Sequence, residues 1–279
     1  MSSKSIPYLL AAPGFILLIV FLVLPLVSII WPTFFDGNLT FASYIAFFQD
    51  SYNVSIFMRT LRISLVVTFF CALFGVPVAY YIARADKKFR SLMMALVLFP
   101  LLTNSVVRSF AWINILGQKG VVNNLLMATG IIDAPIPLLY SEFAITIGSI
   151  YLFLPLMVIT LVGIIENIDT EIMEAAETLG ANRLTAFLKV ILPLSVPGII
   201  VGSILVFTGT LTAYTTPQLL GGNKNMMLST FLYQNAMTLG NWTNASVIAL
   251  IMIVTTLIVM KIFNLIASVI DKRGEEQHA

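Results

Sequence analysis

Six long apolar segments follow one another along the chain, and charged or strongly polar residues separate them. A helix needs about 20 mostly apolar residues to cross the hydrocarbon core of a bilayer, and every segment reaches that length. The pattern therefore predicts an all-α membrane protein with six transmembrane helices. The predicted spans cover residues 8–31, 63–83, 91–116, 143–165, 193–216 and 243–265.

Composition agrees with a membrane protein and excludes several other classes. Hydrophobic residues make up 59% of the chain and charged residues 10%, whereas soluble domains are about half apolar and about a quarter charged. The net charge of +2 is too small to indicate nucleic-acid binding. The single cysteine, Cys71, and the single histidine, His278, leave almost nothing for a disulfide, a His-based triad or a metal cluster.

The first apolar segment has two interpretations, an uncleaved span or a signal peptide. Its apolar run is longer than the stretch of about 7–15 residues that signal peptides carry, and no convincing small-x-small cleavage site follows it. We therefore expect an uncleaved transmembrane helix.

Lysine and arginine are divided unequally between the two sides that six spans define. One side carries ten of them and the other five. Because cytoplasmic loops are enriched in Lys and Arg, the side with ten, which includes both termini, is predicted to be cytoplasmic. The ten are Lys4, Arg84, Lys87, Lys88, Arg90, Arg183, Lys189, Lys261, Lys272 and Arg273; the five are Arg59, Arg62, Arg108, Lys119 and Lys224.

The charged segment 166–190, between the fourth and fifth predicted spans, is expected to form a short helix at 170–179. Asp169 or Thr170 is suited to cap its start, and Gly180 is suited to end it. Three acids share one face of this helix, and three apolar residues share another. The acids are Glu171, Glu174 and Glu177, and the apolar residues are Ile172, Ala176 and Leu179.

A second helix is expected to follow and to run into the fifth span. Asn182 is suited to cap it, and Pro193 and Pro197 are expected to bend the entry to the span because proline removes a backbone donor. By itself the charged segment could be a solvated amphipathic loop. The small Ala175 and Ala176 would instead let another protein surface approach closely.

One motif in this segment resembles a known family. Glu174-Ala175-Ala176, then Gly180, then Val190-Ile191-Leu192-Pro193 is similar to the EAA loop of binding-protein-dependent ABC importers, with Val190 where the family usually has Ile. The resemblance implies a type I ABC importer permease fold, whose cytoplasmic coupling helix docks in a cleft of the ATPase. The ATPase-coupling residues that it implies are Glu174, Ala175, Ala176, Gly180, Leu192 and Pro193.

ATP hydrolysis is expected to reside on another chain. The sequence lacks the Gly-x-x-x-x-Gly-Lys-Ser/Thr pattern of a P-loop, and Gly221-Gly222-Asn223-Lys224 has the wrong spacing. We therefore expect no catalytic residue, cofactor or metal in this chain, with ATP and Mg bound by a partner ATPase.

Arg108 is the one charge well inside an apolar segment. In a straight third span it would lie about 25 Å from Ser91, near the outer interface. It could snorkel into the headgroups, or it could face the translocation pathway, as intramembrane charges often do. Asn104, Arg108 and Trp112 recur every four residues and are candidate pathway residues. Tyr151 and Tyr214 add hydroxyls near other span ends and are further candidates.

Three further segments resemble the spermidine/putrescine permeases. They are Phe99–Arg108, Gly130–Pro135 and Leu219-Leu220-Gly221-Gly222, and the likeness covers most of residues 57–267. The external segment 216–224 could be a tight turn, or a loop that caps the pore mouth and touches a binding protein. The implied organisation is an N-terminal helix and external segment at 1–56, a permease domain at 57–267 and a cytoplasmic tail at 268–279.

The resemblance implies one half of an ATP-driven importer in the bacterial inner membrane, for polyamines or a related organic amine. Its implied partners are a second, unlike permease, two ATPase subunits and an external binding protein. Other small solutes, such as a phosphonate or an opine, stay open. An ion-coupled secondary transporter also fits six spans, but the spans lack the acidic residues that coupling needs.

Overall fold

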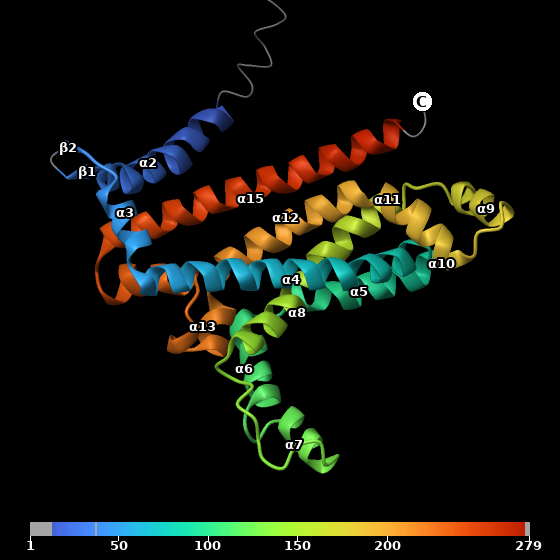
Figure 1. Ribbon diagram of the computed structural model, residues 1–279, viewed down its shortest axis with the longest axis horizontal. Coiled ribbons are helices and arrows are strands. Elements are labelled where there is room, and N and C mark those ends of the chain that lie inside the picture. The colour runs from blue at the N-terminus through green and yellow to red at the C-terminus, as the bar shows by residue number, and fades with distance from the viewer. Residues whose placement is uncertain (1–12, 37, 277–279) are drawn as a thin grey trace, which may run out of the picture. The chain divides into compact units, whose positions relative to one another are not determined.

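The computed structural model describes residues 13–36 and 38–276 (Figure 1). These residues divide into two compact units. Among the described residues, the first unit comprises those up to 55 together with 231–253, and the second comprises 56–230 and everything from 254 onward. The first residues of the predicted first span, Lys4 and His278 lie outside the described residues.

The first unit begins with a 22-residue helical segment, Pro13–Phe34, whose most apolar stretch has no residue buried within the structure. Thr33 and Tyr44 share a hydrogen bond of 2.5 Å, and the Phe34 ring packs on Phe41 and Tyr44. This aromatic cluster joins the first span to α3. The elements are η1 Ile19–Val23, α2 Leu24–Ile30, η2 Trp31–Phe34, the antiparallel strands β1 Phe35–Asp36 and β2 Asn38–Leu39, α3 Ala42–Gln49 and η5 Gln234–Thr238.

Three helices contribute residues to both units, namely α4 Ser51–Ala83, α14 Leu228–Tyr233 and α15 Trp242–Glu276. The remaining helices belong to the second unit. They are α5 Lys87–Leu102, α6 Ser105–Leu116, α7 Val121–Ala128, α8 Glu142–Ile165, α9 Thr170–Thr178, α10 Arg183–Ala186, η3 Phe187–Ile191, α11 Leu192–Leu194, α12 Val196–Thr212, α13 Thr215–Gly221 and η4 Asn223–Asn225.

Helix α8 forms the centre of the second unit, where it packs against α5 and α12. Met157 of α8 is fully buried and faces a glycine on each side. A Cβ at Gly75 of α4 would lie 2.6 Å from the Met157 Cγ, and one at Gly202 of α12 would lie 2.5 Å from its Sδ. These glycines therefore let three helices approach closely around one flexible thioether, which suits methionine as a core residue.

The predicted second, fourth and sixth spans are confirmed as continuous helices, within Ser51–Ala83, Glu142–Ile165 and Trp242–Ser268. The expected continuous third span is wrong. It is broken between α5 and α6, and the helices on either side of the break meet at 94°. The predicted fifth span is a helix only to Thr212, and 215–221 forms the separate helix α13. The described residues thus contain four uninterrupted candidate spans, or up to six if each bent pair counts as one.

Candidate functional site

The predicted short helix in the charged segment exists as α9, and Gly180 ends it as expected. Gly180 has φ +90°, a left-handed conformation that costs little only for glycine. Its N–H donates to Glu177 O at 2.9 Å, and the Ala181 N–H donates to Ala176 O at 3.0 Å. These two bonds form a Schellman motif. Asp169 stands at the N-cap, but its side chain makes no capping hydrogen bond.

Side chains from α4, from α5 and from the turn between them hold the first part of this segment against the helix bundle. Arg90 pairs with Glu166 at 2.6 Å, and the Arg84 guanidinium donates to Ile168 O at 2.9 Å. The Tyr80 hydroxyl lies 3.1 Å from the Met173 sulfur. Sequence reasoning missed these contacts, although the excess of Arg over acids at 84–90 opposite an acidic loop is the signal that could have indicated them.

The outward surface of α9 is exposed, and the helix has no buried residue. Glu174 and Ala175 are exposed, while Ala176 is half-buried. The expected apolar face of Ile172, Ala176 and Leu179 does not pack as a unit, because Leu179 is 89% exposed and Ile172 is 44% exposed. Instead Met173 packs on the core. The bundle therefore presents a short helix that ends in an uncovered leucine.

The chain after α9 bends before it enters the bundle, as the two prolines predicted. The Asn182 Oδ1 accepts from the Thr185 N–H at 2.8 Å and so caps α10. The helices before and after Ser195 meet at 66°. Ser195 is fully buried, and its hydroxyl donates to Ile191 O at 2.7 Å. Leu192 packs on the core, whereas Pro193 is exposed.

Arg108 lies at the other bend, between α5 and α6, and not on a straight helix. Its side chain is 9% exposed. The guanidinium donates to Pro100 O at 2.7 Å and to Thr103 O at 3.3 Å, so it satisfies carbonyls that the end of α5 leaves free. Asn104 caps α6 by accepting from the Val106 N–H at 2.8 Å. This arginine therefore lies against backbone carbonyls at the break, and its place in the translocation pathway stays a prediction.

Two of the candidate pathway residues come together between α6 and α8. The Trp112 and Tyr151 rings are 5.7 Å apart in an edge-to-face arrangement, and both side chains are half-buried. Tyr214 stands at the start of α13 and is also half-buried. Helix α13 packs against both α6 and α8. The structure therefore places Trp112 and Tyr151 in contact, with Tyr214 on the neighbouring helix.

The segment 216–224 is a packed helix and its cap rather than a tight turn. Thr216 and Leu220 are buried, and a Cβ at Gly148 of α8 would lie 2.6 Å from the Leu220 Cδ1. Beyond the helix, a cavity of about 800 Å³ is bordered by residues 221–224, Gln118 and Tyr140. This end of the second unit is thus hollowed next to the glycine-rich residues that the sequence singled out.

A charged cluster that sequence reasoning missed joins α4, α8 and the segment before α14. Glu142 pairs with Arg62 and, at 3.1 Å, with Arg59. The Arg59 guanidinium also donates to Met226 O at 3.0 Å. The opposite charges of Arg59 and Arg62 and of Glu142 could have indicated the ion pairs. The bond from Arg59 to Met226 O could not be foreseen. Among the residues that the structure describes, no group of three His, Cys, Asp or Glu side chains forms a metal site.

Broken and unbroken apolar helices long enough to cross a bilayer, with a short exposed helix between two of them, define a helical membrane protein. The chain belongs to the family of binding-protein-dependent transport system inner membrane components, whose model matches residues 75–275. It is therefore an inner-membrane permease component of an ABC importer, not an enzyme, with the type I permease fold.

Relatives with assigned functions cover most of the chain. It is 35% identical to the spermidine/putrescine transport system permease protein PotB of Haemophilus influenzae, over 78% of this chain and 76% of that protein. It is 32% identical to PotB of Escherichia coli, over 81% and 84%. In the crystal structure of a bacterial alginate ABC transporter with an alginate pentasaccharide-bound periplasmic protein, a chain with 21% identity matches with a TM-score of 0.79. That match covers 94% of this chain and 93% of the other.

Proposed function

We propose that the chain forms half of the translocation pathway of an ATP-driven importer for polyamines such as spermidine and putrescine. The observation that carries the substrate class is the identity of 35% and 32% to two spermidine/putrescine permeases over about four fifths of the chain. The permease domain of this proposal spans 57–267, after an N-terminal segment at 1–56 and before a tail at 268–279.

Helix α9 is the proposed coupling helix, with Glu174, Ala175, Ala176 and Gly180 at its contact with a partner ATPase. Its exposed surface supports this role, because α9 has no buried residue and presents Glu174 and Ala175 to solvent, where a partner surface can reach them. ATP and Mg bind the partner. When two ATPase subunits close, the docked helices move toward each other, and the Arg90–Glu166 pair and the bend near Leu192 and Pro193 pass the motion to α8 and α12. Alternating access is then a rocking of helices around a central site.

The proposed topology places both termini, 84–90 and α9 in the cytoplasm. Single cysteines at Asp86 and Gly180 should be labelled only from the cytoplasmic side, and cysteines at Gly120 and Gly222 only from outside. The native Cys71 is fully buried, so background labelling is small. Labelling of position 180 from outside intact cells contradicts the coupling assignment.

The proposed assembly contains two permease chains, two ATPase chains and an external binding protein. Six spans provide one half of a pathway, and the polyamine-type permeases that this chain resembles occur as unlike pairs. An active purified complex with two copies of this chain and no second permease overturns the heterodimer.

Substrate recognition in the proposed pathway falls to aromatic side chains, since the predicted spans contain no carboxylate. Trp112, Tyr151 and Tyr214 are the candidates, because aromatic faces attract ammonium groups by cation–π interaction. Arg108 binds backbone carbonyls and so serves the bend next to them. Selection is then shared with the binding protein.

The experiment that tests the function is uptake by the complete complex in proteoliposomes with its cognate binding protein. Labelled spermidine and putrescine should accumulate in an ATP-dependent manner, and unlabelled polyamines should compete. No accumulation of either polyamine, together with uptake or competition by a phosphonate or an opine, assigns another substrate. ATP-independent uptake driven by an ion gradient contradicts the importer mechanism itself.

A further inference from the structure

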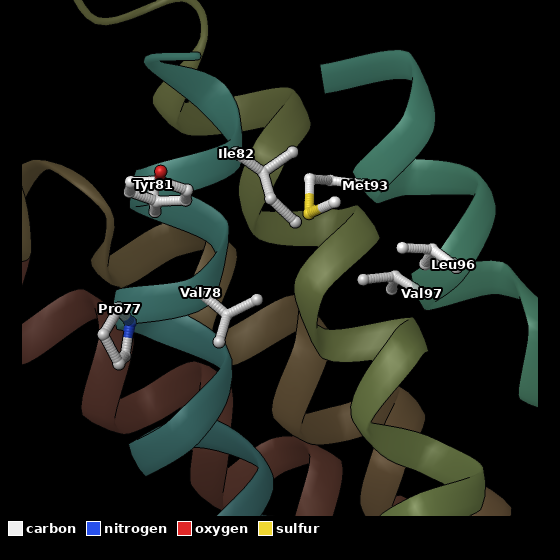
Figure 2. Close-up of a pocket in the computed structure, with 7 residues that line it drawn as sticks. All are labelled: Pro77, Val78, Tyr81, Ile82, Met93, Leu96 and Val97. Atoms are coloured by element: carbon white, nitrogen blue, oxygen red, sulfur yellow. The ribbon is translucent and has the colours of Figure 1, made fainter. Parts of the chain in front are cut away.

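An apolar groove opens between α4 and α5 in the second unit. Its volume is about 470 Å³, within the range of about 300–1,000 Å³ typical of small-molecule sites. Ile82 is 2% exposed at its floor, whereas Val78 and Leu96 are 39% and 59% exposed at its rim. Figure 2 shows side chains of the two helices facing one another across it. It is lined by Pro77, Val78, Ile82, Met93, Leu96 and Val97, together with Tyr81.

A polar cavity adjoins this groove at Tyr81, which lines both. The second cavity has a volume of about 550 Å³, and its wall includes Arg84, Arg183 and Asp86. The Tyr81 ring therefore stands between an apolar compartment and a predominantly cationic one. Such a pair of compartments fits an amphipathic molecule with a hydrocarbon chain at one end and an anionic group at the other.

The basic residues at the polar cavity outnumber the acids beside them. Lys87 and Lys88 are exposed in the first turn of α5, and neither makes an ion pair within 4.0 Å among the described residues. The Arg183 side chain is 91% exposed, and its Nε forms a long ion pair of 3.7 Å with Glu177 Oε1. Arg84 uses one terminal nitrogen on Ile168 O. Arg84 and Arg183 line the polar cavity, where Asp86 is the one acid, and Lys87 and Lys88 stand in the sequence between the lining residues Asp86 and Phe89.

The spacing along the helices matches the length of a lipid. Val78 lies six residues before Arg84, about 9 Å along α4, and Leu96 lies eight residues after Lys88, about 12 Å along α5. A phosphate held at the basic residues would place the first half of an acyl chain beside the groove. Basic pockets between transmembrane helices on one side of the bilayer recognise anionic headgroups in this way.

We propose that this groove is a binding site for an anionic glycerophospholipid, with one acyl chain between α4 and α5 and the phosphate at Arg84, Lys87, Lys88 and Arg183. The lipid belongs to the leaflet beside α9, which is the cytoplasmic leaflet in the topology proposed above. A purely apolar protein segment would fill the groove but would leave the adjoining cations without a counter-charge. The bound lipid would hold α4 and α5 together next to the segment 166–190, which contains α9.

Native mass spectrometry of the purified complex tests this site. The complex is stripped of lipid in detergent and offered phosphatidylglycerol and phosphatidylcholine of the same acyl composition in equal amounts. We expect several-fold more phosphatidylglycerol than phosphatidylcholine to be retained. Lys87→Gln combined with Lys88→Gln should bring this ratio close to one, and Leu96→Trp should lower the retention of both lipids.

Matched variants separate the groove from general effects. Lys261→Gln removes an exposed charge on α15, and Leu92→Trp adds the same ring to an exposed position of α5 that does not line the groove. Both should behave as wild type, and Lys87→Arg with Lys88→Arg should keep the ratio. A wild-type ratio near one, or a ratio that both lysine changes leave intact, overturns the proposal. Loss of the second permease from Leu96→Trp with unchanged lipid retention overturns it too, and assigns the groove to a protein partner.

Discussion

The two bent helix pairs of the second unit are built in different ways. The bend between α5 and α6, at 94°, is held by a buried side chain: the Arg108 guanidinium bonds Pro100 O and Thr103 O. The bend before α12, at 66°, is held by prolines and by the Ser195 hydroxyl, next to an exposed helix. One bend is therefore held by a buried arginine, while the other lies next to a helix whose surface is exposed.

This difference separates stability from function in a testable way. Residues of α9 have few contacts to lose within the chain, so their substitution should affect transport without affecting folding. Arg108 at the α5–α6 bend is buried and hydrogen-bonded, so its substitution should affect folding as well as transport. Thermal stability of the purified complex and uptake at saturating binding protein, measured together, separate the two cases.

The largest effect on uptake is expected from the surface of α9. Glu174→Lys and Leu179→Asp should each lower uptake at least tenfold and reduce co-purification of the ATPase, with no change in thermal midpoint. A tenfold loss corresponds to about 1.4 kcal/mol of lost contact free energy. Asp133→Lys, at another exposed acidic position, is the control. Normal uptake in both α9 variants breaks the comparison, because the exposed helix would then have no partner.

The second effect concerns the glycine that ends α9. Apart from its two chain neighbours, no described residue has an atom within 4 Å of a Cβ built on Gly180, so a side chain has room there but must adopt φ +90°. That conformation costs about 1–2 kcal/mol for an ordinary residue, and Asn tolerates it better than most. We expect Gly180→Val to lower uptake about tenfold and Gly180→Asn to keep most of it. Equal losses in both variants would point to steric exclusion by the ATPase instead of backbone strain.

Replacement of Arg108 should show the opposite signature. Arg108→Met leaves two carbonyls at the break without their donor, at a cost of about 1–3 kcal/mol. The thermal midpoint should fall by several degrees, and uptake should fall less than in the α9 variants. Val106→Ala, at an exposed neighbouring position, should change neither. Lost uptake at an unchanged thermal midpoint would show that Arg108 acts on the substrate directly. That result would support the prediction that Arg108 is a pathway residue.

The aromatic pair should affect substrate affinity more than assembly. Trp112→Ala removes an edge-to-face contact worth about 0.5–1.5 kcal/mol, together with the proposed cation–π surface for an amine. We expect the apparent KM for spermidine to rise several-fold at a nearly unchanged maximal rate, and Tyr151→Phe, which keeps the ring, to have a smaller effect. Phe110→Ala, at an exposed position on α6, is the control. A fall in maximal rate alone would place the pair outside the pathway.

Sequence could predict the segment from α9 to the proline bend better than the break between α5 and α6, for physical reasons. The α9 helix, its end at Gly180, the Asn182 cap and the proline bend rest on local backbone chemistry, which a short segment contains in full. The break at 103–104 depends on a side chain folding back over eight residues, from Arg108 to Pro100. Hydropathy alone predicts a continuous helix for residues 91–116. Contacts such as Thr60 Oγ1 with the Leu228 N–H join residues 168 positions apart, and no local pattern announces them.

The smallest and sharpest test uses the same substitution in both regions. Asn104 and Asn182 each cap a helix beside a bend, with Oδ1 accepting a backbone N–H at 2.8 Å. Loss of such a cap costs about 1 kcal/mol, so Asn104→Ala and Asn182→Ala should lower the thermal midpoint by similar small amounts. Only Asn182→Ala should also lower uptake severalfold, because α10 connects the proposed coupling helix to α12. Asp at either position restores the cap acceptor and should restore the thermal midpoint. A larger loss of uptake from Asn104→Ala would reverse the comparison and make the α5–α6 break the more mobile, transport-limiting bend.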